Sequence, residues 1–175
     1  MIITLSGYMG AGKTALGREL ARLSGWDFID LDDFITAATG LTPAQIIRRH
    51  GERTLRIAEN KALNEILTER DRLILALGGG TLTEPFNRNM VDTYSVRVFV
   101  DTPWEHIRAR LAASETDRPL WQTDERQARA HYEARLPDYR RARLVFRNDF
   151  PDASSAALAL WELLQKELNL RPSED

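Results

Sequence analysis

Cysteine is absent from the 175-residue chain. Disulfides and cysteine-ligated metal centres are therefore excluded, and we expect a reducing compartment, the cytoplasm, as its place of action. Long apolar runs are also lacking, so no segment reaches the length of a membrane-spanning helix. Because Met1 leads directly into a predicted strand, without a basic segment followed by a long apolar one, we expect no cleaved leader.

Charge of one sign is not in excess, since 24 Lys and Arg stand against 26 Asp and Glu. This balance gives no reason to expect a nucleic acid or a membrane surface as partner. The three histidines, His50, His106 and His131, lie in polar helical contexts, and we interpret them as surface residues without a role. Repeats and low-complexity tracts are missing, so residues 1–175 are expected to form a single domain.

Residues 7–14, Gly-Tyr-Met-Gly-Ala-Gly-Lys-Thr, match G-x-x-x-x-G-K-[ST], the phosphate-binding P-loop. An apolar run at 2–5 precedes them and predicts a buried strand, and residues 15–23 follow with leucines at helical spacing. At the ordinary glycine usage of about 7%, a chance match in such a chain is on the order of one per cent or less. The strand–loop–helix context therefore predicts a nucleotide-binding site.

The residue types in this loop suit a bound phosphate. Glycines accept positive φ and carry no Cβ, so backbone N–H groups can converge on an anion at the start of a helix. Lys13 can reach the β- and γ-phosphates, and the Thr14 hydroxyl can ligate Mg²⁺. The predicted ATP-binding residues of the loop are Gly10, Ala11, Gly12, Lys13, Thr14 and Ala15.

Strands alternate with helices along the whole chain, which predicts an open, mostly parallel α/β sheet with right-handed crossovers. Apolar runs predict strands at 2–5, 26–30, 73–77, 96–100 and 144–146. Helical patterns occupy 34–39, 43–50, 52–67, 85–91, 103–111, 125–136 and 154–168.

Local signals refine some of these helices. Thr42-Pro43 and Thr102-Pro103 each predict a threonine N-cap followed by proline at N1, and Glu105 would complete a capping box with Thr102. The terminal helix is expected to bury Leu158, Trp161, Leu164 and Leu168 on one face.

Acidic residues and glycines follow two further strands. Because ligands bind at the carboxyl ends of parallel strands, the P-loop, the Asp30-Asp32 pair and residues 78–80 should converge. One aspartate could serve Mg²⁺ and the other a substrate hydroxyl; the alternative is an acidic N-cap cluster, which Asp33 fits better than Asp30. Three glycines after a buried strand indicate that something approaches the backbone closely.

The arginines are ambiguous from sequence alone. Arg56 could pair with Glu59 at i,i+3, and a solvated surface pair is as good an interpretation as a functional one; the same holds for Arg135. Arg118 lies ahead of Pro119 in the irregular stretch 112–124. Because this stretch has no apolar period, we expect a lid that is mobile without ligands.

In combination the motifs resemble those of shikimate kinases over nearly the whole chain. Residues 28–32 match F-[IL]-D-x-D, and 51–59 match G-E-x-x-F-R-x-x-E with Leu55 in place of Phe. Residues 77–80 match the glycine triplet and 118–120 the lid motif R-P-L, with Trp121 after it in place of an aliphatic residue. Residues 135–139 match R-x-P-L-Y with Asp138 in place of Leu.

The resemblance implies a three-layer P-loop kinase fold, with a five-stranded parallel sheet, helices on both faces and a mobile lid at about 112–124. The substrate-binding part would span about 31–62. The implied reaction transfers the γ-phosphoryl of MgATP to the 3-hydroxyl of shikimate, for chorismate and aromatic amino acid biosynthesis, in a monomer. The implied site residues are Lys13, Asp32 and Arg118 for catalysis, Arg118 also for the ATP phosphates, Asp32, Arg56, Gly79 and Arg135 for shikimate, and Thr14 and Asp30 for Mg²⁺.

Two other functions remain open at this point. One is a related P-loop small-molecule kinase, such as a gluconate or nucleoside monophosphate kinase, although a nucleotide acceptor would need more phosphate-binding arginines. The other is an ATP-binding protein without catalysis, against which the intact Lys13, Thr14, Asp30 and Asp32 argue. Adenine contacts are expected from backbone groups near 147–152.

Overall fold

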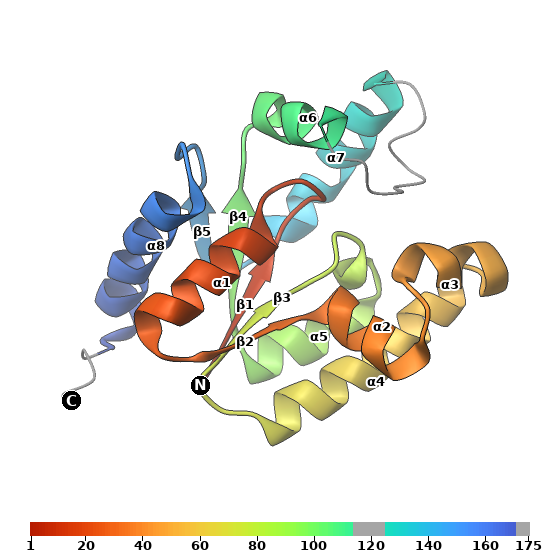
Figure 1. Cartoon of the computed structure of the whole chain (residues 1–175), viewed down its shortest axis with the longest axis horizontal. Coiled ribbons are helices and arrows are strands. Elements are labelled where there is room, and N and C mark those ends of the chain that lie inside the picture. Colours follow the sequence, from red (N-terminus) through yellow and green to blue (C-terminus); the bar gives the residue numbers. More distant parts are fainter. Residues whose placement is uncertain (114–124, 171–175) are drawn as a thin grey trace.

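The computed structural model describes residues 1–113 and 125–170, and these form a three-layer α/β fold (Figure 1). Five strands, all parallel, make one sheet in the order β2-β3-β1-β4-β5. The strands are β1 (Ile2–Ser6), β2 (Asp27–Asp30), β3 (Leu73–Ala76), β4 (Val96–Asp101) and β5 (Leu144–Arg147). The predicted parallel sheet is confirmed, and each strand lies where an apolar run predicted it.

Strand β1 is the centre of the sheet and is buried along its whole length. Its Ile3 lies opposite Ile74 of β3 and Val96 of β4. The strand also carries two buried hydroxyls, and both have partners: Thr4 Oγ1 lies 2.9 Å from Ser95 Oγ, and Ser6 Oγ donates to the Val98 carbonyl at 3.1 Å. Polar atoms in the central strand therefore cost little, because each is hydrogen-bonded.

Helices cover both faces of the sheet. They are α1 (Lys13–Ser24), α2 (Leu31–Thr39), α3 (Pro43–His50), α4 (Glu52–Glu69), α5 (Pro85–Tyr94), α6 (Trp104–Ala112), α7 (Glu125–Tyr139) and α8 (Ala153–Leu168), with a 3₁₀ turn at Thr81–Thr83. One core cluster joins α1 and α8 to the sheet, through residues such as Leu16, Leu20 and Leu160. A second cluster joins the six helices from α2 through α7 to the sheet, with residues such as Leu63, Val91 and Ile107. Figure 1 shows α1 and α8 on one face and α4 and α5 on the other.

The structure corrects several predicted helix details. Helix α2 begins at Leu31 instead of residue 34, because the Asp30 carboxylate accepts from the Asp32 N–H at 3.0 Å and caps it. In α8 the buried face comprises Ala156, Ala157, Leu160 and Leu164, whereas Leu158 is 52% exposed. The predicted Thr42 cap is confirmed, with reciprocal bonds between Thr42 and Gln45.

Helix α6 does not have the predicted capping box. It begins at Trp104, and the Thr102 hydroxyl donates to the Ala11 carbonyl instead of capping the helix. Its last residue is Ala112, so the predicted lid, apart from residues 112 and 113, lies outside the described residues. None of the helices in residues 1–113 and 125–170 combines the length and the apolar character that crossing a membrane requires.

Candidate active site

The P-loop connects β1 to α1 and has the backbone conformation that its glycines allow. Gly7, Gly10 and Gly12 have φ of +146°, +77° and +90°, values that residues with a Cβ rarely adopt. At Gly7 space is limiting as well, because a Cβ would lie 2.9 Å from the Val100 carbonyl oxygen. The loop therefore requires glycine at these turns.

Side chains from two other connections hold the loop in place. The Ala11 carbonyl accepts from Thr102 Oγ1 at 2.9 Å and from Asn148 Nδ2 at 3.1 Å, and both donor residues are buried. The Gly10 carbonyl accepts from Arg110 Nη1 at 3.3 Å. Because the carbonyls of Gly10 and Ala11 are held by these hydrogen bonds, the loop presents a fixed backbone to a ligand.

Lys13 is only 8% exposed although it carries a charge. Its ammonium donates to the carbonyls of Gly7 at 2.8 Å and Tyr8 at 3.0 Å. The side chain thus lies across its own loop, and these carbonyls partly compensate the cost of burying its charge.

Thr14 and Asp30 form a short contact between α1 and the end of β2. The Thr14 hydroxyl donates to Asp30 Oδ2 at 2.6 Å, while Oδ1 of the same carboxylate caps α2. Asp30 is therefore the cap, and the expectation that Asp33 suits this role better is wrong. Asp33 is exposed, and its carboxylate lies 3.6 Å from Arg18.

Asp32 lies in the first turn of α2 and is partly buried. Burial raises the pKa of its carboxyl to about 6, and Asp30 raises it further, against an opposing effect of the Lys13 charge. A Cβ on Gly78 would lie 2.8 Å from Asp32 Oδ1. Thus Asp32 is one of the groups that approach the glycine triplet.

Arg56 projects from α4 toward the same triplet, where a Cβ on Gly80 would lie 2.5 Å from its Nη2. Its guanidinium bonds Glu59 at 2.6 Å and Glu52 at 2.9 Å. The side chain is 13% exposed, so the interpretation as a solvated surface pair is wrong. Its Nε is buried and finds no acceptor among the described residues.

Glu59 is more deeply buried than its partner and also accepts from Thr81 Oγ1 at 2.8 Å. Burial raises the pKa of its carboxyl, and the adjacent Arg56 charge opposes this. The glutamate thereby anchors Arg56 against the turn that follows the glycines.

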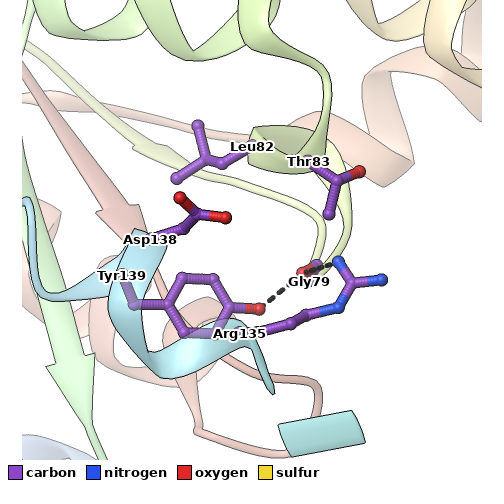
Figure 2. A pocket seen from close by; sticks show the side chains of 6 residues that line it. All are labelled: Gly79, Leu82, Thr83, Arg135, Asp138 and Tyr139. Atoms are coloured by element: carbon purple, nitrogen blue, oxygen red, sulfur yellow. Dashed lines mark hydrogen bonds between the residues drawn. The ribbon is translucent and has the colours of Figure 1, made fainter. Parts of the chain in front are cut away.

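Arg135 and Tyr139 reach the triplet from α7 (Figure 2). Arg135 Nη1 donates to the Gly79 carbonyl at 3.2 Å, and the Tyr139 hydroxyl donates to the same oxygen at 2.5 Å. Burial raises the pKa of Tyr139, so this hydroxyl remains a donor. Asp138, beside them, pairs with Arg88 of α5 at 3.0 Å, so the departure from the family's leucine adds a link between two helices.

His131 contradicts the sequence interpretation, whereas His50 and His106 are exposed as expected. His131 is partly buried, and its two ring nitrogens contact the Tyr8 hydroxyl and the Arg135 guanidinium. The spacing of four residues between His131 and Arg135 was an available signal, since such residues share a helix face. The Tyr8 contact had no such signal.

The described site residues predicted from sequence lie around the P-loop and the glycine triplet. Lys13 and Asp32 are on the P-loop side, and Arg56 and Arg135 flank the triplet, from α4 and α7. Arg118 lies outside the described residues. Sequence reasoning gave no role to Arg110 and Asn148 and assigned Thr102 to a helix cap, whereas all three hold the loop.

Comparisons with known proteins agree with this geometry. A family profile described as shikimate kinase matches residues 9–164. The chain belongs to the shikimate kinase family. A shikimate kinase of Halorhodospira halophila (strain DSM 244 / SL1) is 39% identical over 166 residues, which cover 93% of each chain.

Solved structures of the shikimate kinase family show the same fold. That of the shikimate kinase from Acinetobacter baumannii in complex with shikimate superposes with a TM-score of 0.86 at 37% identity, covering 96% of this chain and 93% of the other. A sugar kinase from Janibacter sp. HTCC2649, with a TM-score of 0.65, is 19% identical and shares the fold alone. Family membership therefore favours a shikimate kinase over the two alternatives left open by the sequence.

Proposed function

We propose that this member of the shikimate kinase family transfers the γ-phosphoryl of MgATP to the 3-hydroxyl of shikimate, giving shikimate 3-phosphate for aromatic amino acid biosynthesis. The observation that carries the proposal is the pair Arg56 and Arg135, which flank one glycine triplet beside Asp32 and the P-loop. Two guanidinium groups at one end and a phosphate-binding loop at the other suit a small hydroxy acid as acceptor.

The arginines would bind the shikimate carboxylate, together with the backbone at Gly79. A planar guanidinium matches a carboxylate in a bidentate arrangement that lysine cannot reproduce. The buried Arg56 Nε, which lacks an acceptor among the described residues, supports this role. An unpaired buried donor costs about 1–3 kcal/mol, and an incoming carboxylate would relieve that cost. In this proposal residues 31–62, which carry Asp32 and Arg56, form the acceptor side.

The P-loop would bind the ATP phosphates through backbone N–H groups of residues 10–15, at the positive end of α1. For this the Lys13 ammonium exchanges its loop carbonyls for phosphate oxygens. Its positive charge would then offset the charge on the transferring group. Arg118 is proposed to add a second cation, a role that rests on the R-P-L match because the residue lies outside the described part.

Asp32 is proposed as the base that accepts the proton of the 3-hydroxyl. The raised pKa of about 6 makes it a stronger base than an ordinary aspartate while leaving it ionised near neutral pH. The closeness of Asp32 Oδ1 to Gly78, and the effect of the Lys13 charge on its pKa, support a position of this carboxylate near both the glycine triplet and the P-loop.

Thr14 and Asp30 are proposed to hold Mg²⁺, and their oxygens, 2.6 Å apart, are the hard ligands that this ion prefers. Within residues 1–113 and 125–170 no three acidic or histidine side chains gather as a metal cage. The remaining positions would therefore belong to water and phosphate oxygens, as is usual for Mg²⁺ at nucleotide sites. Bound Mg²⁺ would supply charge neutralisation at the β- and γ-phosphates.

We also propose that the enzyme acts in the cytoplasm as a monomer. The absence of cysteine supports a reducing compartment, and the monomer rests on the family resemblance. Light scattering coupled to gel filtration should give a mass near 20.0 kDa. A mass near twice that value would contradict the monomer.

A coupled assay of ADP release against several acceptors tests the function. Shikimate, gluconate, a nucleoside monophosphate and no acceptor should be compared at equal MgATP. We expect turnover with shikimate alone, and phosphorus NMR should identify shikimate 3-phosphate. Turnover with gluconate only would point to the related sugar kinases, and no turnover with any acceptor would point to an ATP-binding protein without catalysis.

A further inference from the structure

His131 lies between the nucleotide loop and an arginine of the acceptor site. Its Nδ1 is 2.8 Å from the hydroxyl of Tyr8, the second residue of the P-loop. Its Nε2 is 3.1 Å from Arg135 Nε and 3.0 Å from Arg135 Nη2. One imidazole thus connects the two substrate sites through side-chain hydrogen bonds.

The donors and acceptors in this chain fix the state of the ring. Arg135 can only donate, so Nε2 must carry the lone pair and the neutral ring must carry its proton on Nδ1. Nδ1 then donates to the Tyr8 oxygen, and the Tyr8 hydroxyl proton is directed to the Ala128 carbonyl, 3.3 Å away. Each bond is compatible with the next only in this tautomer.

The network also fixes the direction of the guanidinium. The Gly79 carbonyl accepts from Nη1 of Arg135 (Figure 2). His131 occupies the edge that carries Nε, so Arg135 is held at two sides. An edge-to-face contact between the Tyr8 and His131 rings, with centroids 5.6 Å apart, holds the imidazole from the loop side. Tyr132 and Trp104 pack against Tyr8 in turn.

We propose that neutral His131 is a positioning residue that orients Arg135 for the carboxylate of the acceptor and couples this orientation to the P-loop through Tyr8. The proposal rests on the proposed function, since it assigns Arg135 to shikimate. It predicts that His131 acts on acceptor binding far more than on ATP binding or on the chemical step.

Protonation of His131 would replace the Nε2 lone pair with a donor facing another donor. The charged and titratable groups around the ring are Arg135 on its own helix, Tyr8 from the P-loop and Glu52 from α4. Burial, and then the Arg135 charge, lower the pKa of His131, which keeps the ring neutral at physiological pH, while Glu52 opposes this. The hydrogen bond between Arg135 and His131 Nε2 should therefore be lost only at a pH below the usual pKa of histidine.

Steady-state kinetics of His131→Phe and His131→Gln test the proposal. Phenylalanine fills the space without an acceptor, and we expect the KM for shikimate to rise roughly tenfold, with the KM for ATP and kcat within about twofold. Glutamine offers an amide oxygen to Arg135, so it should recover most of the loss. His106→Gln, on an exposed histidine of α6, is the matched control and should behave as the parent.

Two further measurements keep the test independent of any one variant. In the parent the KM for shikimate should rise as pH falls from 7 to 5, and in His131→Gln this rise should be smaller. Asp32 also titrates in this interval, but it does so in both proteins, so the difference between them reports on His131. Tyr8→Phe keeps the ring but removes the hydroxyl, and its effect should be smaller in the His131→Phe background than in the parent.

The outcomes separate the two proposals. Normal shikimate kinetics of the parent together with an unchanged KM in His131→Phe would overturn the role of His131 and leave the function standing. Equal losses for shikimate and ATP, without recovery by glutamine, would also overturn it and indicate a general packing role. A parent that does not phosphorylate shikimate would overturn the proposed function itself.

Discussion

At the scale of single residues, the charges of the site are buried before any ligand arrives. Two loop carbonyls accept from the Lys13 ammonium, burial raises the pKa of Asp32, and Arg56 is paired with buried Glu59. Such arrangements keep charged groups in position, because a group that is already desolvated needs little reorganisation when charge moves past it. Two predictions belong to this scale.

The first prediction concerns Lys13→Met. The variant should fold but lose kcat by a factor of about 10²–10³, since removing one preorganised group at the transferring charge costs roughly 3–4 kcal/mol. The measurement is kcat at saturating MgATP and shikimate. Lys61→Met, an exposed lysine of α4, should keep parental activity and serves as the control. A Lys13→Met variant within about threefold of the parent would contradict the role.

The second prediction concerns the pH dependence of Asp32. Its pKa is raised from 3.8 unfolded to about 6 folded. A raised pKa means that the stability contribution is fully present below the unfolded value and is lost as pH rises through the folded value. Asp32→Asn should therefore match the parent near pH 4 and be more stable above pH 7, by about 1–3 kcal/mol. Activity should fall by at least about 10²-fold.

Urea unfolding at both pH values, with a chelator present to exclude bound Mg²⁺, measures this difference. Asp33→Asn on the same turn is the control, because its carboxylate is exposed and only loosely paired with Arg18. If Asp32→Asn were equally stable relative to the parent at pH 4 and pH 8, burial of the charge would not be the cost that we infer.

At the scale of elements, the ends of helices and strands carry the site, and here local sequence signals are least reliable. The pattern Thr102-Pro103-x-Glu105 favours a capping box, yet the threonine contacts the P-loop. The threonine hydroxyl can either cap the helix or donate to a carbonyl of the P-loop, and only the position of the loop in space decides between the two. Asp30, in contrast, both caps α2 and contacts Thr14.

Thr102→Val tests the link between α6 and the P-loop. Valine has nearly the same shape but leaves the Ala11 carbonyl with Asn148 as its remaining side-chain donor. We expect a loss of about 1–2 kcal/mol in the free energy of unfolding and a KM for ATP raised several-fold, with the KM for shikimate little changed. Denaturant unfolding and kinetics measure both effects.

Thr93→Val is a suitable control, since its exposed hydroxyl donates to a carbonyl of its own helix, that of Asn89, at 2.7 Å. An unchanged KM for ATP in Thr102→Val would mean that the loop keeps its shape without this anchor.

At the scale of the whole molecule, the fold could be predicted because its signals are local and repeated. Unbroken apolar runs such as 73–77 are typical of strands covered on both faces, and their alternation with helices implies a parallel sheet. The edge of the sheet at which ligands bind could also be predicted from this topology, because it brings the carboxyl ends of β1, β2 and β3 together.

Contacts that side chains make with residues far away in the sequence could not be predicted. Tyr8 and His131 are separated by 123 positions, and Asn148 and Ala11 by 137. No periodicity or turn signal marks such pairs, because their partners are set by how the layers pack. For Arg56 the sequence showed Glu59 at the right spacing but could not show that both are buried.

The final prediction concerns ligand-induced stabilisation of the whole fold. A ligand that binds only the folded state raises Tm, by an amount that depends on its Kd. Arg56→Lys and Arg135→Lys should lose most of the shift caused by shikimate but keep the shift caused by a non-hydrolysable ATP analogue. Thermal unfolding with each ligand measures this, and Arg53→Lys, exposed on α4, is the control. Equal losses for both ligands would assign the arginines to the fold or to the nucleotide.

The glycine triplet has a consequence for any attempt to redesign the acceptor. Even a methyl group at Gly78 or Gly80 would collide with Asp32 or Arg56, and at Gly79 it would press on the Met9 backbone nitrogen at 3.1 Å. In the proposed acceptor site this stretch of backbone therefore tolerates little change, since glycine has no side chain to shorten and an added Cβ would displace Asp32 or Arg56. New acceptor shapes would have to be accommodated elsewhere, for example in the cavity beside Gly79, where Leu82, Thr83 and Asp138 have side chains that can be shortened (Figure 2).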